Sequence, residues 1–70
     1  MTSDEFLRRQ RRYAKERGLT VEHHPKRGKG SHSEVRLGTR TTQLPRGELK
    51  PGTFRDILND LGVNKREFYR

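Results

Sequence analysis

Residues 31–45, SHSEVRLGTRTTQLP, decide the fold, because apolar residues alternate with polar ones up to a glycine. A period of two is typical of a β-strand with one buried face. Gly38-Thr39 fits a two-residue hairpin turn with glycine in the first position. The segment therefore predicts two antiparallel strands, residues 31–37 and 40–45. The expected pairs are Leu37 with Arg40, Val35 with Thr42 and Ser33 with Leu44.

A third strand is predicted over residues 19–24, where Leu19 and Val21 alternate with polar residues. Its register follows if the apolar residues of the strands share one side of the sheet. The expected pairs are Val21 with Val35, Leu19 with Leu37 and His24 with His32. The other side of the sheet is then open and polar. It carries Thr20, Glu22, His24, His32, Glu34, Arg36, Thr41 and Gln43.

A first helix is predicted over residues 3–17. Thr2 together with Glu5, or Ser3 alone, supplies the N-cap, and Gly18 supplies the stop. One face of this helix is formed by Phe6, Gln10, Tyr13, Ala14 and Arg17. The other face is either a solvated surface or a ridge that contacts phosphates. Its cations are Arg8, Arg9, Arg11, Arg12 and Lys15.

A second helix is predicted between Pro51 and Gly62, because apolar residues recur there at i, i+3, i+4 and i+7. These residues are Phe54, Ile57, Leu58 and Leu61. Asn64 and Glu67 form a capping box for a short helical tail, in which Phe68 packs down. We therefore predict one α+β domain over residues 1–70, in the order α-β-β-β-α, with two helices covering one face of a three-stranded antiparallel sheet.

Composition limits the partners of this domain. A net charge of +8 on 70 residues favours nucleic acid, an acidic protein or an anionic membrane surface. Without cysteine there is neither a disulfide framework nor a thiolate metal site. No apolar run is long enough for a membrane span or a signal peptide, so we expect no membrane association and a cytoplasmic location.

Several kinds of site are disfavoured by spacing. His23 and His24 point to opposite faces of a strand, which argues against zinc. The glycines before His32 match neither a P-loop nor a KH loop. Neither Ser31 nor Ser33 faces His32, because alternate residues of a strand point apart, so a serine triad is not expected.

An imidazole on the open face suits the cleavage of RNA. It titrates near neutral pH and can move a proton while the neighbouring 2′-hydroxyl attacks phosphorus, with no metal required. His32 follows a loop whose cations would stabilise the extra charge on that phosphorus. These cations are Lys26, Arg27 and Lys29.

Three motifs in order then carry a resemblance: GKGSH at 28–32, the hairpin, and ELKPGT at 48–53 followed by FRDILNDLGV at 54–63. From about residue 19 to 68 the chain resembles the HicA family of toxin messenger-RNA interferases. The resemblance implies a double-stranded-RNA-binding-domain-like fold and a toxin of a toxin–antitoxin system, a hydrolase of the stress response. It also implies a nuclease without a cofactor that cuts mRNA and inhibits translation.

On the family pattern, His32 is the catalytic residue, with Gly30 and Ser31 as motif neighbours. Gly52 and Thr53 match the start of the last main helix, which either attracts a phosphate or is capped. The expected RNA-binding residues are Lys26, Arg27, Lys29, Gly30, Ser31, Arg46 and Lys50. The auxiliary candidates are His24, Glu34 and Thr53.

The expected partners are RNA, bound mainly through phosphates with little sequence preference, and a HicB-like antitoxin whose acidic residues cover the basic surface. Nothing resembles a DNA recognition helix, so no direct DNA binding is expected. Ser33 and Glu34 depart from the apolar or aromatic residues that follow the family's histidine, so reduced activity or an altered substrate is expected. The alternatives are a non-catalytic RNA-binding module of the same fold and, more weakly, a protein adaptor.

Overall fold

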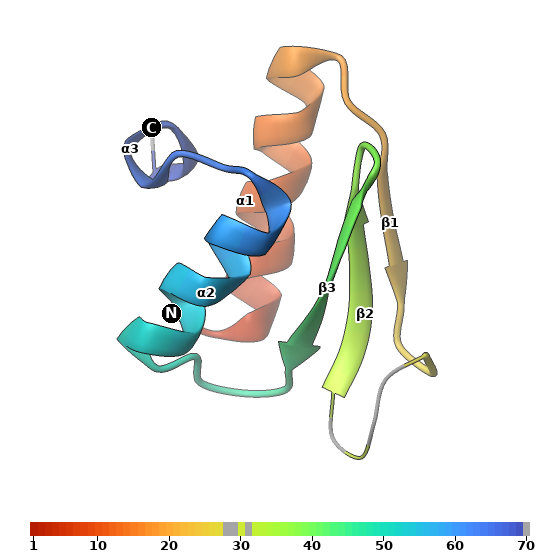
Figure 1. Cartoon of the computed structure of the whole chain (residues 1–70), viewed down its shortest axis with the longest axis vertical. Coiled ribbons are helices and arrows are strands. Elements are labelled where there is room, and N and C mark those ends of the chain that lie inside the picture. Colours follow the sequence, from red (N-terminus) through yellow and green to blue (C-terminus); the bar gives the residue numbers. More distant parts are fainter. Residues whose placement is uncertain (28–29, 31, 70) are drawn as a thin grey trace.

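A computed structural model describes residues 1–27, 30 and 32–69 of the chain. Figure 1 shows two long helices on one side of a sheet whose strand order is β1-β2-β3. Both strand pairs are antiparallel, so the predicted α+β arrangement is confirmed. None of the described helices is both long and apolar enough to cross a membrane. The elements are α1 (Ser3–Arg17), β1 (Val21–His24), β2 (His32–Leu37), β3 (Arg40–Pro45), α2 (Pro51–Leu61) and α3 (Lys65–Tyr69).

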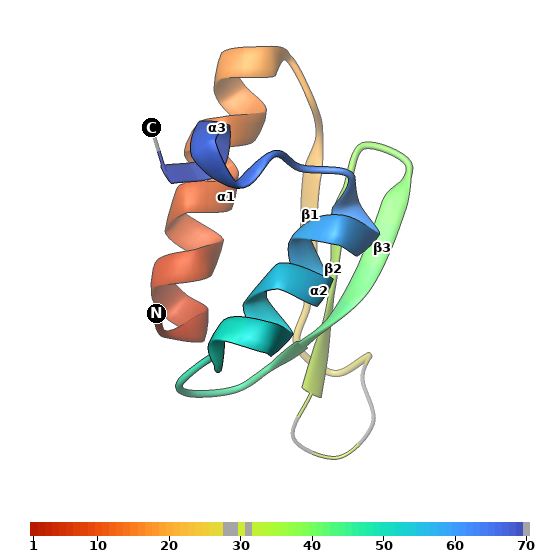
Figure 2. The same ribbon diagram turned by 60° about the vertical axis from the view of Figure 1, so that its left-hand side comes forward.

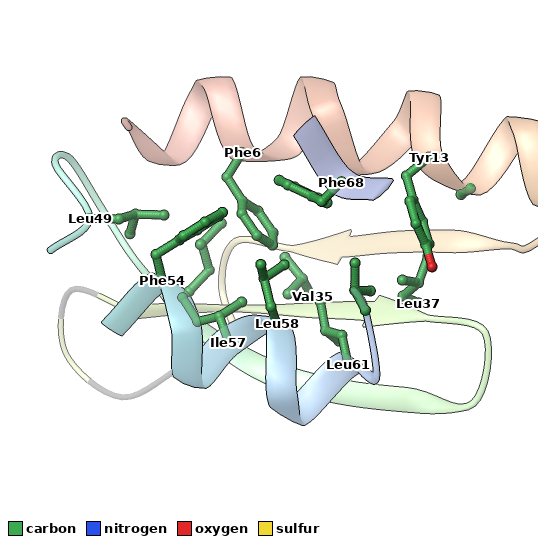
Figure 3. Close-up of a cluster of buried hydrophobic side chains, with 13 residues drawn as sticks. Phe6, Tyr13, Val35, Leu37, Leu49, Phe54, Ile57, Leu58, Leu61 and Phe68 are labelled. Atoms are coloured by element: carbon green, nitrogen blue, oxygen red, sulfur yellow. The ribbon is translucent and has the colours of Figure 1, made fainter. Parts of the chain in front are cut away.

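The core lies between the helices and one face of the sheet, as Figure 3 shows. Phe6 of α1 is fully buried, with its ring centroid 5.1 Å from that of Phe68 and 6.3 Å from that of Phe54. These rings join α1, α2 and α3 above Val35, which is also fully buried. The buried apolar residues are Phe6, Tyr13, Ala14, Val35, Leu37, Leu44, Leu49, Phe54, Ile57, Leu58, Leu61, Val63 and Phe68.

The hairpin of β2 and β3 has the predicted register. Leu37 pairs with Arg40, Val35 with Thr42 and Ser33 with Leu44. Gly38 has a φ of 62°, and no non-glycine described residue has a positive φ, which fits a turn with glycine first. The predicted helix boundaries at Arg17 and Leu61 are also confirmed.

The register of β1 differs from the prediction by two residues. Val21 pairs with Leu37, not with Val35, and the strand begins at residue 21, not at 19. The cause lies at the end of α1, where Gly18 takes a φ of 66° and the Leu19 amide donates to the Ala14 carbonyl at 2.9 Å. This Schellman motif keeps Leu19 in the helix cap, so strand pairing starts later. Since the shift is even, each β1 residue keeps its predicted face.

The cap of α1 is the predicted one, since the Thr2 hydroxyl accepts from the Glu5 amide at 3.2 Å. Asn64 caps α3 by accepting from the Arg66 amide at 2.9 Å. The Glu67 carboxylate, predicted to complete a capping box, instead accepts a hydrogen bond from the Arg17 guanidinium at 3.0 Å. This contact fastens α3 to the end of α1, beside the buried Phe68. Figure 2 shows α3 lying against α1.

Gln10 was expected on the buried face of α1, and its side chain is fully buried. Among the described residues, neither its amide oxygen nor its amide nitrogen has a hydrogen-bond partner. A buried polar group without a partner costs about 1–3 kcal/mol. Gln10 therefore lowers the stability of the domain, whose core is small.

We predict that Gln10→Leu raises the free energy of unfolding by roughly 1–3 kcal/mol, because it removes an unpaired amide without opening a large cavity. Urea denaturation of both proteins measures the difference. Gln43→Leu, an exchange at an exposed position of β3, is the matched control and gives no such gain. A loss of stability in Gln10→Leu contradicts the prediction.

Candidate functional site

A hollow of about 430 Å³ runs along β3 and joins the uncovered face of the sheet to the flank of α2. We call it the β3 hollow. Eight of its ten lining residues carry a hydroxyl, amide, imidazole or carboxylate group. The lining residues are His32, Glu34, Thr41, Thr42, Gln43, Pro45, Thr53, Asp56, Ile57 and Asp60.

His32 is the first residue of β2 and pairs with Pro45 of β3. Because Ser33 is buried on the helix-covered side, alternation turns His32 to the uncovered side. The residue is half-buried and lines the β3 hollow. Its imidazole makes no hydrogen bond to another described residue.

The loop cations lie next to this end of the sheet. Lys26 and Arg27 are exposed in the turn that follows β1, at the end of the sheet where β2 begins (Figure 1). The guanidinium of Arg46 donates to the Pro25 carbonyl at 2.9 Å and so ties the end of β3 to the same turn. Three of the predicted RNA-binding residues therefore surround one end of the sheet.

The structure says less about the other predicted RNA-binding residues. Lys29 and Ser31 lie outside the described residues. Gly30 is exposed with a φ of 62°, and a Cβ there would meet open space. Its backbone conformation, not a shortage of room, favours glycine. Lys50 is exposed at the N-cap of α2, and its side chain forms no capping hydrogen bond.

Of the auxiliary candidates, Glu34 and Thr53 line the β3 hollow together with His32. His24 does not have the expected strand partner. Because β1 is shifted, His24 pairs with Glu34 and not with His32. Its Nε2 lies 2.9 Å from the Glu22 carboxylate, so its imidazole is held on β1.

Two acidic residues of the β3 hollow, Asp56 and Asp60, were not predicted from the sequence. With Thr53 they follow the spacing i, i+3 and i+7, which places them on one flank of α2. Asp60 accepts from the Thr42 hydroxyl at 2.8 Å, which fixes this flank against β3. The spacing was visible in the sequence, but which element the flank would meet was not.

A second missed feature is a polar pair on the covered side of the sheet. His23 Nε2 lies 3.1 Å from the Ser33 hydroxyl, and that hydroxyl donates to the Leu44 carbonyl at 3.4 Å. Burial lowers the pKa of His23, and the charges of Arg11, His24 and Arg46 lower it further, while Asp4 opposes them. The lowered pKa favours the neutral form of His23 in this packing. The even spacing of His23 from Val21 could have placed it on this face.

The fold should lose stability in acid because of His23. Its pKa in the folded state lies below the ordinary value of 6.5, so neutral His23 stabilises the fold above pH 6.5. That contribution is lost as the pH falls through the folded-state pKa. We predict that His23→Gln, which cannot titrate, flattens the fall in unfolding free energy between about pH 7 and pH 5. His32→Gln, on the uncovered face, is the matched control, and an unchanged slope in His23→Gln contradicts the prediction.

No group of three histidine or acidic side chains is arranged to hold a metal ion within residues 1–27, 30 and 32–69. Comparison of the chain with protein-family models, curated proteins and solved structures gives no match. The resemblance to the HicA family therefore stays a prediction carried by the sequence motifs.

Proposed function

We propose that this chain is a HicA-like toxin: a metal-independent endoribonuclease that cuts mRNA in the cytoplasm and inhibits translation. The observation that carries the proposal is the position of His32. Its imidazole lies on the uncovered face of the sheet, in a hollow, at the same end of the sheet as the exposed Lys26 and Arg27. An acid–base group, room for a nucleotide and cations for phosphate are what this chemistry requires.

In the proposed reaction the 2′-hydroxyl of RNA attacks the adjacent phosphorus. His32 accepts the proton of that hydroxyl, or donates a proton to the departing 5′-oxygen. The bond from phosphorus to the 5′-oxygen breaks, leaving a 2′,3′-cyclic phosphate and a free 5′-hydroxyl. Lys26, Arg27 and Arg46 stabilise the negative charge that builds on the phosphate oxygens.

The same cations suggest how the toxin is silenced. A HicB-like antitoxin with acidic residues would meet the exposed Lys26 and Arg27 and cover His32 at the same time. Opposite charges speed the encounter and fix the orientation of the two proteins. The toxin would then be inactive while its partner is bound.

A second candidate is a non-catalytic RNA-binding module. It is favoured by the His32 imidazole, which no other described residue orients through a hydrogen bond. A catalytic histidine is commonly held in one orientation by such a partner. The two candidates share the RNA-binding surface and differ only in chemistry.

Cleavage in excess EDTA separates these candidates. We predict that the purified chain cuts single-stranded RNA under these conditions and that His32→Ala slows cleavage by at least about 100-fold. His24→Ala is the control and keeps most of the activity, because its imidazole is bonded to Glu22 of the same strand, β1, and does not line the β3 hollow. No cleavage by the unaltered chain, or equal cleavage by His32→Ala, overturns the nuclease proposal.

The loop cations should set the salt dependence of binding. In the His32→Ala background, replacing Lys26 and Arg27 by glutamine should reduce the slope of log affinity against log salt by about 1.4 for single-stranded RNA. Fluorescence anisotropy at several salt concentrations measures it. The control replaces Lys65 and Arg66 of α3, which removes the same charge elsewhere. An equal reduction in the control shows that the loop is not the contact surface.

A further inference from the structure

The β3 hollow is acidic although the chain as a whole is strongly basic. Glu34, Asp56 and Asp60 all line it, in a chain with 17 lysines and arginines and only 9 acidic residues. Three carboxylates repel a phosphate, so the hollow is a poor place for the RNA backbone. Lys26, Arg27 and Arg46 lie instead in and beside the turn that follows β1. The two surfaces therefore suit different parts of one nucleotide.

The carboxylates in the hollow have oxygen atoms that accept no hydrogen bond from another described residue. Neither Glu34 nor Asp56 forms an ion pair within 4 Å with another described residue. Asp60 uses Oδ2 to accept from the Thr42 hydroxyl. An ionised carboxylate can only accept hydrogen bonds. A ligand of the hollow must therefore present donors. Glu34 and Asp56 both have no bond of their own in the described structure, and Asp56 is the more exposed of the two.

The other lining groups suit a flat, partly apolar ligand. Pro45 and the small exposed part of Ile57 supply apolar surface, while Thr41, Thr53 and Gln43 supply hydroxyl and amide groups. Sites for small ligands combine apolar lining with a few placed polar groups in this way. The volume of about 430 Å³ is in the range of such sites.

We propose that the β3 hollow binds a nucleobase of the RNA substrate through its donor edge, with Asp56 as the principal acceptor. This inference rests on the proposed function, because it takes RNA as the ligand. Guanine presents N1–H and the N2 amino group side by side and can donate both to one carboxylate. Uracil presents a single N–H between two carbonyl oxygens, which the carboxylates repel. The hollow therefore selects guanine most strongly and uracil least, with adenine and cytosine between them.

Binding of nucleotides to the unaltered full chain tests this without any cleavage. The four ribonucleoside 5′-monophosphates share the same ribose and phosphate, so differences between them report the base alone. Amide chemical shifts of Thr53, Ile57 and Gln43 are followed by NMR during each titration. We expect the dissociation constant of GMP to be at least about fivefold below that of UMP. Equal constants, or GMP-induced shifts confined to other parts of the chain, overturn the proposal.

Two variants sharpen the test. Asp56→Asn offers one acceptor and one donor in place of two acceptors, so it should weaken GMP binding by about fivefold. It should not weaken UMP binding, because the new amide can donate to a uracil carbonyl. Glu16→Gln, exposed on α1, makes the same change in net charge and should alter neither. Unchanged GMP binding in Asp56→Asn removes the role of that carboxylate and overturns the proposal.

A basic side chain from a protein partner is the competing occupant, and arginine methyl ester serves as its probe. If the ester shifts Thr53 and Ile57 while no nucleotide does, the hollow is a protein contact and the proposal fails. The result is also separable from the nuclease proposal. Selective GMP binding without RNA cleavage refutes only the nuclease, and cleavage without base selection refutes only the nucleobase site.

Discussion

The burial of one face of β2 beneath the helices is the constraint on which the rest of the structure depends. Val35 is fully buried at the centre of this face, and Ser33 and Leu37 are buried on either side of it. A strand that places these residues inward must turn the alternate ones outward. His32, Glu34 and Arg36 therefore lie on the uncovered face, and a register change of one residue would exchange the two sets.

The core that enforces this alternation stands on one side of the sheet only. Phe6, Phe54 and Phe68 come from three different helices and meet above Val35. Placing both long helices on the same side concentrates the few apolar residues of the chain into one cluster, which a domain of this size needs. The opposite side of the sheet is not covered by either long helix. It can carry an imidazole and unpaired carboxylates in contact with water, where they do not weaken the core.

The sequence predicted the local features well, because they depend on near neighbours. The ends of α1 and α2 follow from Gly18 and Gly62, and the register of β2 with β3 follows from a two-residue turn. The register of β1 did not follow, since it depends on how many residues the helix cap retains. The Ala14 carbonyl binds the Leu19 amide, and pairing begins two residues later than the hydrophobic pattern alone suggested.

The candidate site was predictable only in part for the same reason. Alternation within β2 placed His32 and Glu34 on the open face, but Asp56 and Asp60 join them through the packing of α2 against β3. That contact depends on the side chains that fill the core, and spacing within α2 does not reveal it. The charge separation between the hollow and the turn therefore emerged only from the structure.

The account is tested most directly by the imidazole signals of the three histidines in the presence of an RNA that cannot be cut. Saturating the chain with 2′-O-methylated RNA should shift the ring C–H resonances of His32, because that ring lies in the β3 hollow. The resonances of His23, which is bonded to Ser33 on the covered side, should stay in place. If the RNA binds and moves His23 but leaves His32 unchanged, the uncovered face is not the working surface of this protein.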